Sequence, residues 1–129
     1  MSTLAEAPVS AGLPASDIAR AKAFYKETLG LPMVGEFEGS VMFECGDGTR
    51  LFVYPSEYAG TNQATAAGWQ VADIEAAMDL LGGRGVTFEE YDLPGLQTVD
   101  GIATLGSSRS SWFKDTEGNI LALIEGSSG

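Results

Sequence analysis

The sequence contains no histidine and only one cysteine, Cys45. The absence of histidine removes the commonest metal ligand and the side chain best suited to acid–base catalysis at neutral pH. A single cysteine excludes an internal disulfide, which agrees with a reducing compartment. Any catalysis must therefore use carboxylates, tyrosine, lysine, arginine, serine or Cys45.

Basic residues are also few, because 7 lysines and arginines stand against 18 acidic residues and give a formal net charge of −11. A surface of this charge repels a polyanion, so we expect no nucleic-acid partner. No apolar run approaches the roughly 20 residues of a membrane span, so we expect no membrane partner. The first ten residues, MSTLAEAPVS, lack the basic start and long apolar stretch of a secretory signal, and the expected location is cytoplasmic.

The 129 residues, of which 44% are hydrophobic, suit one domain with a single core. Ala7 to Leu13 is predicted as a strand, after which Ser16 caps a helix that ends at Gly30. Asp73 is predicted to cap a second helix, which ends at the pair of glycines 82–83. Further strands are predicted at 33–38, 40–45, 50–54, 64–71, 86–91, 110–114 and 120–125.

The two halves of the chain repeat one another. SDIARAKAFY at 16–25 matches ADIEAAMDLL at 72–81, and FECGDG at 43–48 matches FKDTEG at 113–118. Because both matches occur in the same order within each half, an internal repeat is indicated. We therefore predict an α+β fold of two βαβββ modules, about 7–59 and 64–126, within a single domain that spans 1–129.

Three stretches carry a resemblance to a known family: LPASDIARAKAFYKETLGL (Leu13 to Leu31), WQVADIEAAMDLLGGRGV (Trp69 to Val86) and WFKDTEGNILALIE (Trp112 to Glu125). They resemble the strand–helix units and the last hairpin of the vicinal oxygen chelate superfamily, which includes glyoxalases, bleomycin resistance proteins and extradiol dioxygenases. The resemblance implies two half-barrel modules whose concave faces build a cavity. It also implies a homodimer.

In members that use a metal, the resemblance implies four ligand positions, which here hold Ser10, Ala66, Ala122 and Phe52, or Val53 if the register differs by one. Only Ser10 has a side-chain oxygen, whereas a divalent ion needs three or four well-placed donors. We therefore expect no metal and no cofactor. Metal-dependent glyoxalase or dioxygenase activity is not expected.

Small and aromatic side chains occupy the predicted concave faces, which is typical of a site for an organic ligand. The alternative is that bulky neighbours or a second chain fill this space. The candidate ligand contacts are Ser10, Phe52, Tyr54, Ala66, Gln70, Arg109, Trp112 and Ala122.

The connection from Glu89 to Ser111 is longer than an ordinary loop, and this length indicates a functional role. Its polar candidates are Tyr91, Asp92, Asp100 and Arg109. The guanidinium of Arg109 suits a carboxylate or phosphate, although a solvated loop charge is the simpler interpretation. Elsewhere, Glu44 and Tyr54 are weak candidates for catalysis, because a carboxylate facing an apolar cavity is able to act as a base.

Three functions remain open at this point. The first is a metal-independent protein that binds a small organic molecule in a cleft, with a drug-sequestering role. The second is a metal-independent isomerase, lyase or hydrolase that acts on a small metabolite. The third is a dimeric scaffold without a ligand.

Overall fold

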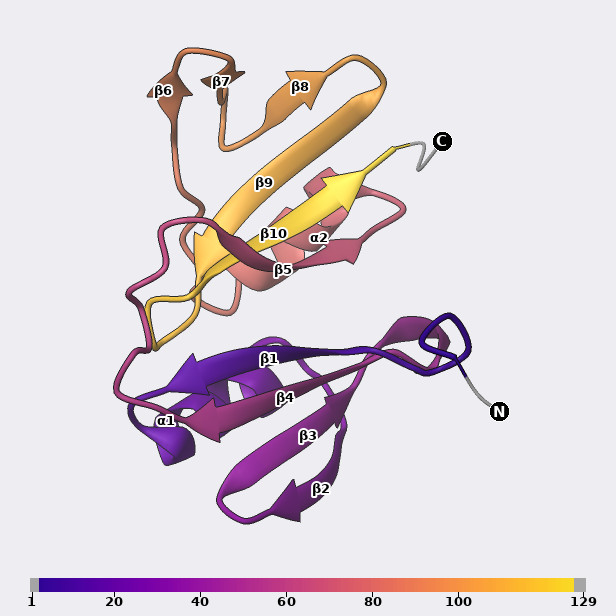
Figure 1. Ribbon diagram of the computed structural model, residues 1–129. Coiled ribbons are helices and arrows are strands. Elements are labelled where there is room, and N and C mark those ends of the chain that lie inside the picture. Colours follow the sequence, from indigo (N-terminus) through magenta and orange to yellow (C-terminus); the bar gives the residue numbers. More distant parts are fainter. Residues whose placement is uncertain (1–2, 127–129) are drawn as a thin grey trace. The chain divides into compact units, whose positions relative to one another are not determined.

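The computed structural model describes residues 3–126. The chain forms two compact units, and the boundary between them in the sequence lies between Ala59 and Gly60 (Figure 1). Each unit contains one four-stranded sheet and one main helix. The predicted α+β fold of two βαβββ modules is therefore confirmed. Within residues 3–126, no helix is long and apolar enough to cross a membrane.

The first unit forms a mixed sheet in the order β1-β4-β3-β2, in which β1 runs parallel to β4 and the other pairs are antiparallel. Its elements are β1 (Ser10–Ala15), α1 (Ile18–Ala23), the π-helical turn η1 (Phe24–Thr28), β2 (Met33–Phe37), β3 (Ser40–Glu44), the 3-10 turn η2 (Gly46–Gly48) and β4 (Arg50–Pro55). The first strand lies further along the chain than predicted and includes Pro14. This proline is tolerated because β1 is an edge strand of the sheet, where one side of the backbone is unpaired within the unit.

Both main helices begin at an aspartate. The Asp17 carboxylate accepts a hydrogen bond from the Arg20 amide at 3.1 Å, so Asp17, and not Ser16 as predicted, is the N-cap of α1. Asp73 caps α2 (Ile74–Gly82) as predicted, through a 3.0 Å bond from the Ala76 amide. Gly30 has a φ of 75°, the left-handed conformation expected of a glycine just after a helix.

The second unit forms a sheet in the order β5-β10-β9-β8, with β6 and β7 as a separate hairpin. Its strands are β5 (Thr65–Gln70), β6 (Asp92–Leu93), β7 (Leu96–Gln97), β8 (Ala103–Leu105), β9 (Ser108–Lys114) and β10 (Ile120–Glu125). The strand predicted at 86–91 is wrong. Within that segment Phe88 makes one isolated bridge to Phe113, and β8 takes the fourth place in the sheet.

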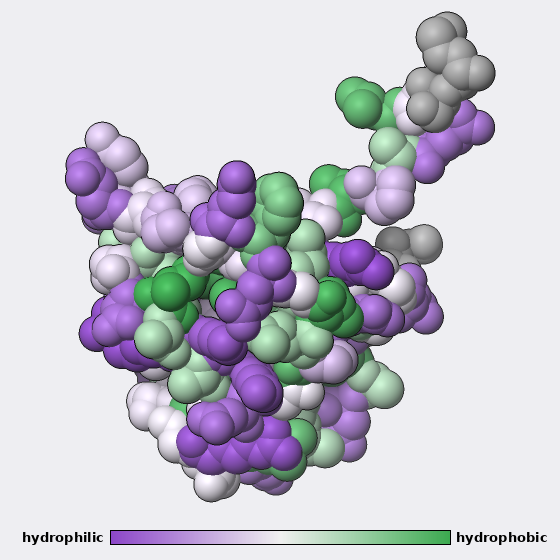
Figure 2. Space-filling view, turned by 90° about the horizontal axis from the view of Figure 1, so that it is seen from below, coloured by the Kyte–Doolittle hydropathy of each residue, from purple (hydrophilic) through white to green (hydrophobic). Residues whose placement is uncertain are grey.

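Apolar residues fill the space between each sheet and its helix. The buried residues include Leu13, Tyr25, Phe43 and Val53 in the first unit and Ile74, Phe113, Leu121 and Leu123 in the second. We call the opposite side of each sheet, away from the helix of the same unit, its open face. On the molecular surface seen in Figure 2, exposed apolar side chains form small groups between polar ones.

The DTEGN turn between β9 and β10 is held by the buried carboxylate of Asp115. This carboxylate accepts hydrogen bonds from the amide of Glu117, the amide of Asn119 and the side-chain nitrogen of Asn119, each at 2.8 Å. Gly60 packs against the turn so closely that an added Cβ would lie 2.7 Å from the Glu117 carbonyl oxygen. The Asp115 carboxylate therefore has a structural role.

Candidate functional site

The open faces of the two sheets are related by the internal repeat. Phe52 on β4 lies opposite Gly12 on β1, and Ala122 on β10 lies opposite Gly68 on β5. An added Cβ on Gly12 would lie 2.8 Å from the tip of the Phe52 ring, so the glycine leaves room for that ring across β1. The position opposite this glycine therefore holds an aromatic ring in the first unit and a methyl group in the second.

The side chains at the positions implied for metal ligands do not fit a metal ion. Phe52, Ala66 and Ala122 have no side-chain donor, and Ser10 offers one hydroxyl at the exposed start of β1. Within residues 3–126, no three aspartate, glutamate or cysteine side chains lie close enough to hold an ion.

The open face of the first unit carries an aromatic pair, Phe52 and Tyr54, whose ring centroids are 5.8 Å apart. A cavity of about 240 Å³ adjoins Phe52, and its other lining residues are Phe37, Ser40, Val41 and Met42. This cavity lies below the size of most ligand sites, which begin at roughly 300 Å³.

The two weak catalytic candidates of this face are separated along the sheet. Glu44 lies opposite Arg50 on β4, and Tyr54 is four residues further along that strand, roughly 13 Å away at the usual rise per residue. Arg50 is also the strand partner of Ser10. The structure therefore places a cation beside Glu44 and does not bring Glu44 and Tyr54 together.

The second unit contains a larger apolar pocket of about 320 Å³ between its open face and the β6–β7 hairpin. Its lining residues are Gln63, Ala64, Thr65, Tyr91, Leu93, Leu96, Trp112 and Ile120. We call it the Trp112 pocket. Among the predicted contacts, Trp112 lines it and Ala122 is the cross-strand neighbour of Trp112. By strand alternation Gln70 shares the open face with Gly68, whereas Ala66 lies at the irregularity of β5 between Thr65 and Ala67; neither lines the pocket.

Two interactions fix the indole of Trp112. Its Nε1 donates a hydrogen bond to Thr65 Oγ1 at 3.1 Å. The Tyr91 ring meets it edge to face, with centroids 5.5 Å apart and planes at 80°. Burial is the main cause that raises the pKa of Tyr91, and the charge of Glu89 raises it further. The Tyr91 hydroxyl therefore stays protonated at neutral pH and is able to donate a hydrogen bond.

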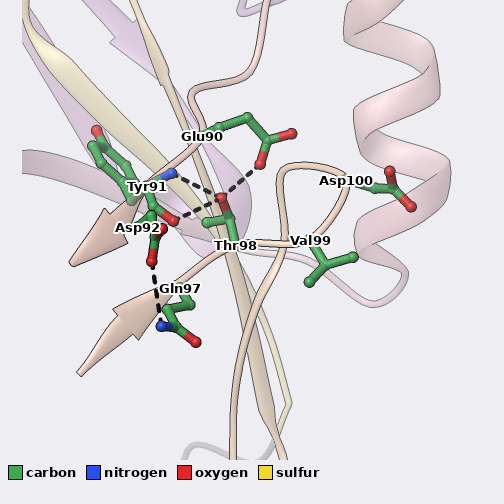
Figure 3. A pocket seen from close by; sticks show the side chains of 7 residues that line it. All are labelled: Glu90, Tyr91, Asp92, Gln97, Thr98, Val99 and Asp100. Carbon is green, nitrogen blue, oxygen red and sulfur yellow. Dashed lines mark hydrogen bonds between the residues drawn. The ribbon is translucent and has the colours of Figure 1, made fainter. Parts of the chain in front are cut away.

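Tyr91 also borders a second, open pocket of about 620 Å³, which is drawn in Figure 3. Three of its seven lining residues are acidic (Glu90, Asp92 and Asp100), and none is basic. Glu90 accepts a bond from Thr98, and Asp92 accepts a bond from Gln97 at 3.3 Å. We call this the acidic pocket. One tyrosine thus separates an apolar space from an acidic one.

Arg109 lies on the helix-facing side of β9, away from the Trp112 pocket. Its guanidinium donates to both carboxylate oxygens of Glu125, at 2.9 and 3.1 Å, and to Glu75 at 3.3 Å. The second Glu125 oxygen also accepts the Ile74 amide at the start of α2, at 2.9 Å. Arg109, which was predicted as a ligand contact, thus binds the Glu125 carboxylate that attaches the end of β10 to the N-terminus of α2.

This ion pair leads to a pH prediction. The hydrogen bond from Arg109 is the largest cause that lowers the pKa of Glu125 below its ordinary value of 4.5, and the Ile74 amide adds to it. A lowered folded-state pKa stabilises the fold above pH 4.5 and loses this contribution as the pH falls through the folded value. We therefore expect Glu125→Gln to lower the free energy of unfolding at pH 7 and to flatten its decline in acid.

Urea unfolding between pH 7 and pH 3 measures this effect. Glu75→Gln is the matched control, because Glu75 is more exposed and accepts a single bond from the same arginine. The same decline in acid for wild type and Glu125→Gln would contradict the prediction.

The sequence indicated part of this site. Trp112, which was predicted as a ligand contact, lines the Trp112 pocket, and so does Tyr91, a polar candidate of the connection from Glu89 to Ser111. Leu93, Leu96 and Thr65 were missed. The leucine pair spaced three apart around Pro94 and Gly95 was the available signal of a tight hairpin, because proline and glycine favour turns.

Comparisons with known proteins agree with this fold. The profile of the Glyoxalase/Bleomycin resistance protein/Dioxygenase superfamily matches residues 7–123. No curated protein matches the sequence.

Three solved structures illustrate the likeness. UcmS2 is 17% identical over 92% of this chain and 96% of its own, with a TM-score of 0.73. TnmS3, an antibiotic binding protein from Streptomyces sp. CB03234, is 21% identical over 98% and 100%, with a TM-score of 0.68. Lactoylglutathione lyase from Agrobacterium tumefaciens is 22% identical over 94% of each chain, with a TM-score of 0.67. Identities this low show a shared fold, and the profile match spans most of the sequence; the chain belongs to the glyoxalase/bleomycin resistance protein/dioxygenase superfamily.

Proposed function

We propose that this protein binds a small planar aromatic molecule in the Trp112 pocket, independently of a metal, and sequesters it without transforming it. The observation that carries the proposal is the edge-to-face pair of Trp112 and Tyr91 in an otherwise apolar lining. Rings held in this way present a rigid apolar surface, and stacking on such a surface suits flat aromatic ligands.

The size of the pocket supports a ligand of two or three fused rings, because about 320 Å³ lies at the lower end of the range for small-molecule sites. Few polar groups are available to orient a ligand there. The Trp112 N–H is already bonded to Thr65, which leaves the hydroxyls of Tyr91 and Thr65 and the Gln63 amide.

Charge supports a basic ligand. The acidic pocket adjoins Tyr91, and the net charge of −11 attracts cations over the whole surface. A drug-sequestering role agrees with these features, and the fold likeness to an antibiotic binding protein adds to their support. The catalytic alternative has less support, because Glu44 lies opposite Arg50 and far from Tyr54.

The proposal includes a cytoplasmic location and, as the superfamily resemblance implies, a homodimer. Light scattering coupled to size exclusion measures this, and the expected mass is twice the 13.5 kDa of the chain.

Three tricyclic probes of similar area test binding at pH 8: 9-aminoacridine as the cation, acridine as the neutral compound and 9-anthracenecarboxylate as the anion. We expect affinity to decrease in that order, the affinity for 9-aminoacridine to fall with added salt, and EDTA to have no effect. Quenching of tryptophan fluorescence and thermal stabilisation are the readouts. The proposal fails if no probe binds, or if prior metal removal abolishes binding.

A further inference from the structure

Three residues that line the Trp112 pocket belong to the β6–β7 hairpin or come directly before it: Tyr91 precedes the hairpin, and Leu93 and Leu96 lie within it. Its two strands have two residues each, and such a hairpin has little stability of its own. Upstream, the Glu89 amide donates to the Trp112 carbonyl oxygen at 2.8 Å. The position of Tyr91 therefore depends on the contacts that the chain makes after Glu89.

Thr98 binds both backbone groups of Tyr91 at the base of this hairpin (Figure 3). The Tyr91 amide donates to Thr98 Oγ1 at 2.8 Å, and the Thr98 amide donates to the Tyr91 carbonyl oxygen at 2.9 Å. The half-buried Thr98 side chain thus adds a bond that an apolar residue of the same shape cannot make.

The same hydroxyl donates to Glu90 Oε1 at 2.6 Å. That oxygen also accepts the amide of Gly101 at 3.0 Å, and Gly101 is buried beside Phe88 and Met78. The chain of bonds therefore runs from Tyr91 through Thr98 and Glu90 to a buried point of the second unit. A hydroxyl that accepts one bond and donates another is the link at its centre.

We propose that Thr98 is a positioning residue, which fixes Tyr91 against Trp112 and thereby sets the wall of the ligand pocket. This inference rests on the proposed function for its effect on affinity. The hairpin ordering that it requires is independent of any ligand.

The substitutions Thr98→Val and Thr98→Ser form a matched pair, because valine keeps the shape without the hydroxyl and serine keeps the hydroxyl without the methyl group. For 9-aminoacridine we expect about tenfold weaker binding by Thr98→Val and binding within about twofold of wild type by Thr98→Ser. Hydrogen exchange of residues 90–98 is expected to become faster in Thr98→Val alone, while residues 120–125 in β10 keep their protection.

The outcomes separate the two proposals. If wild type binds none of the three probes, the proposed function fails, and the exchange comparison still decides the role of Thr98. Unchanged exchange at 90–98 in Thr98→Val overturns the inference, as does equal probe affinity of the valine and serine variants.

If Thr98→Val loses protection throughout the second unit, Glu90→Ala replaces it as the test. In this variant Thr98 keeps its bonds to the Tyr91 backbone but loses the Glu90 carboxylate, which links Thr98 to the buried Gly101 amide and so holds Tyr91 in place. Faster exchange limited to 90–98 then supports the inference, and unchanged exchange overturns it.

Discussion

Replacing Trp112 with alanine is expected to weaken binding of 9-aminoacridine by at least about thirtyfold. The indole is the largest side chain in the Trp112 pocket, and loss of a central aromatic contact costs about 2 kcal/mol or more of binding free energy. Its removal also leaves Tyr91 without its edge-to-face partner. Equilibrium titration by the fluorescence of the probe measures the effect, because the tryptophan signal changes in this variant.

Two further variants make the result interpretable. Trp112→Phe keeps a ring but loses the bond to Thr65, so we expect an intermediate affinity. Leu80→Ala removes an exposed apolar side chain from α2 and should bind like wild type. If Trp112→Ala binds the probe as tightly as Leu80→Ala, the ligand site lies elsewhere.

Replacing Phe113 with alanine is expected to lower the free energy of unfolding by about 3–5 kcal/mol. Phe113 is fully buried between the sheet and helix of the second unit, where Trp69 stacks on it at 6.5 Å and Phe88 meets its edge at 5.6 Å. The loss is large beside the roughly 5–15 kcal/mol that stabilise a typical domain. Urea unfolding followed by circular dichroism measures it.

Phe37→Ala is the matched control for this substitution, because the Phe37 side chain is 76% exposed at the edge strand β2. We expect a change within about 0.5 kcal/mol. A comparable loss in both variants would mean that Phe113 does not have the core role described above.

Much of the fold was predictable because its signals are local. Asp73 and Gly30 mark helix ends through their own side-chain and backbone chemistry, and the DTEGN turn depends on bonds within five residues. The false strand at 86–91 shows where local signals fail. The segment VTFEEY has strand-like alternation, but only Phe88 bridges to β9, at Phe113, while β8 pairs with Ser108–Ser110 at the other end of the same edge.

The candidate site was less predictable for the same reason. Trp112 was predicted as a ligand contact because its strand belongs to a recognisable motif, and it lines the Trp112 pocket. The ion pairs of Arg109 could not be predicted, because the sequence does not show that Glu125 and Glu75 lie within reach of its guanidinium. The contribution of Thr98 depends on a contact with Tyr91 across a hairpin, and neither residue alone predicts that contact.

The position of β8 at the edge of the second sheet affects how the ligand preference of this protein can evolve. Since β8 completes the second sheet, the sheet's ladder takes no hydrogen bond from the β6–β7 hairpin. Substitutions at exposed hairpin positions such as Leu93 therefore alter the pocket wall while leaving the core that folds the chain unchanged. Natural selection or a designed library is free to vary this hairpin and so change ligand preference on a constant scaffold.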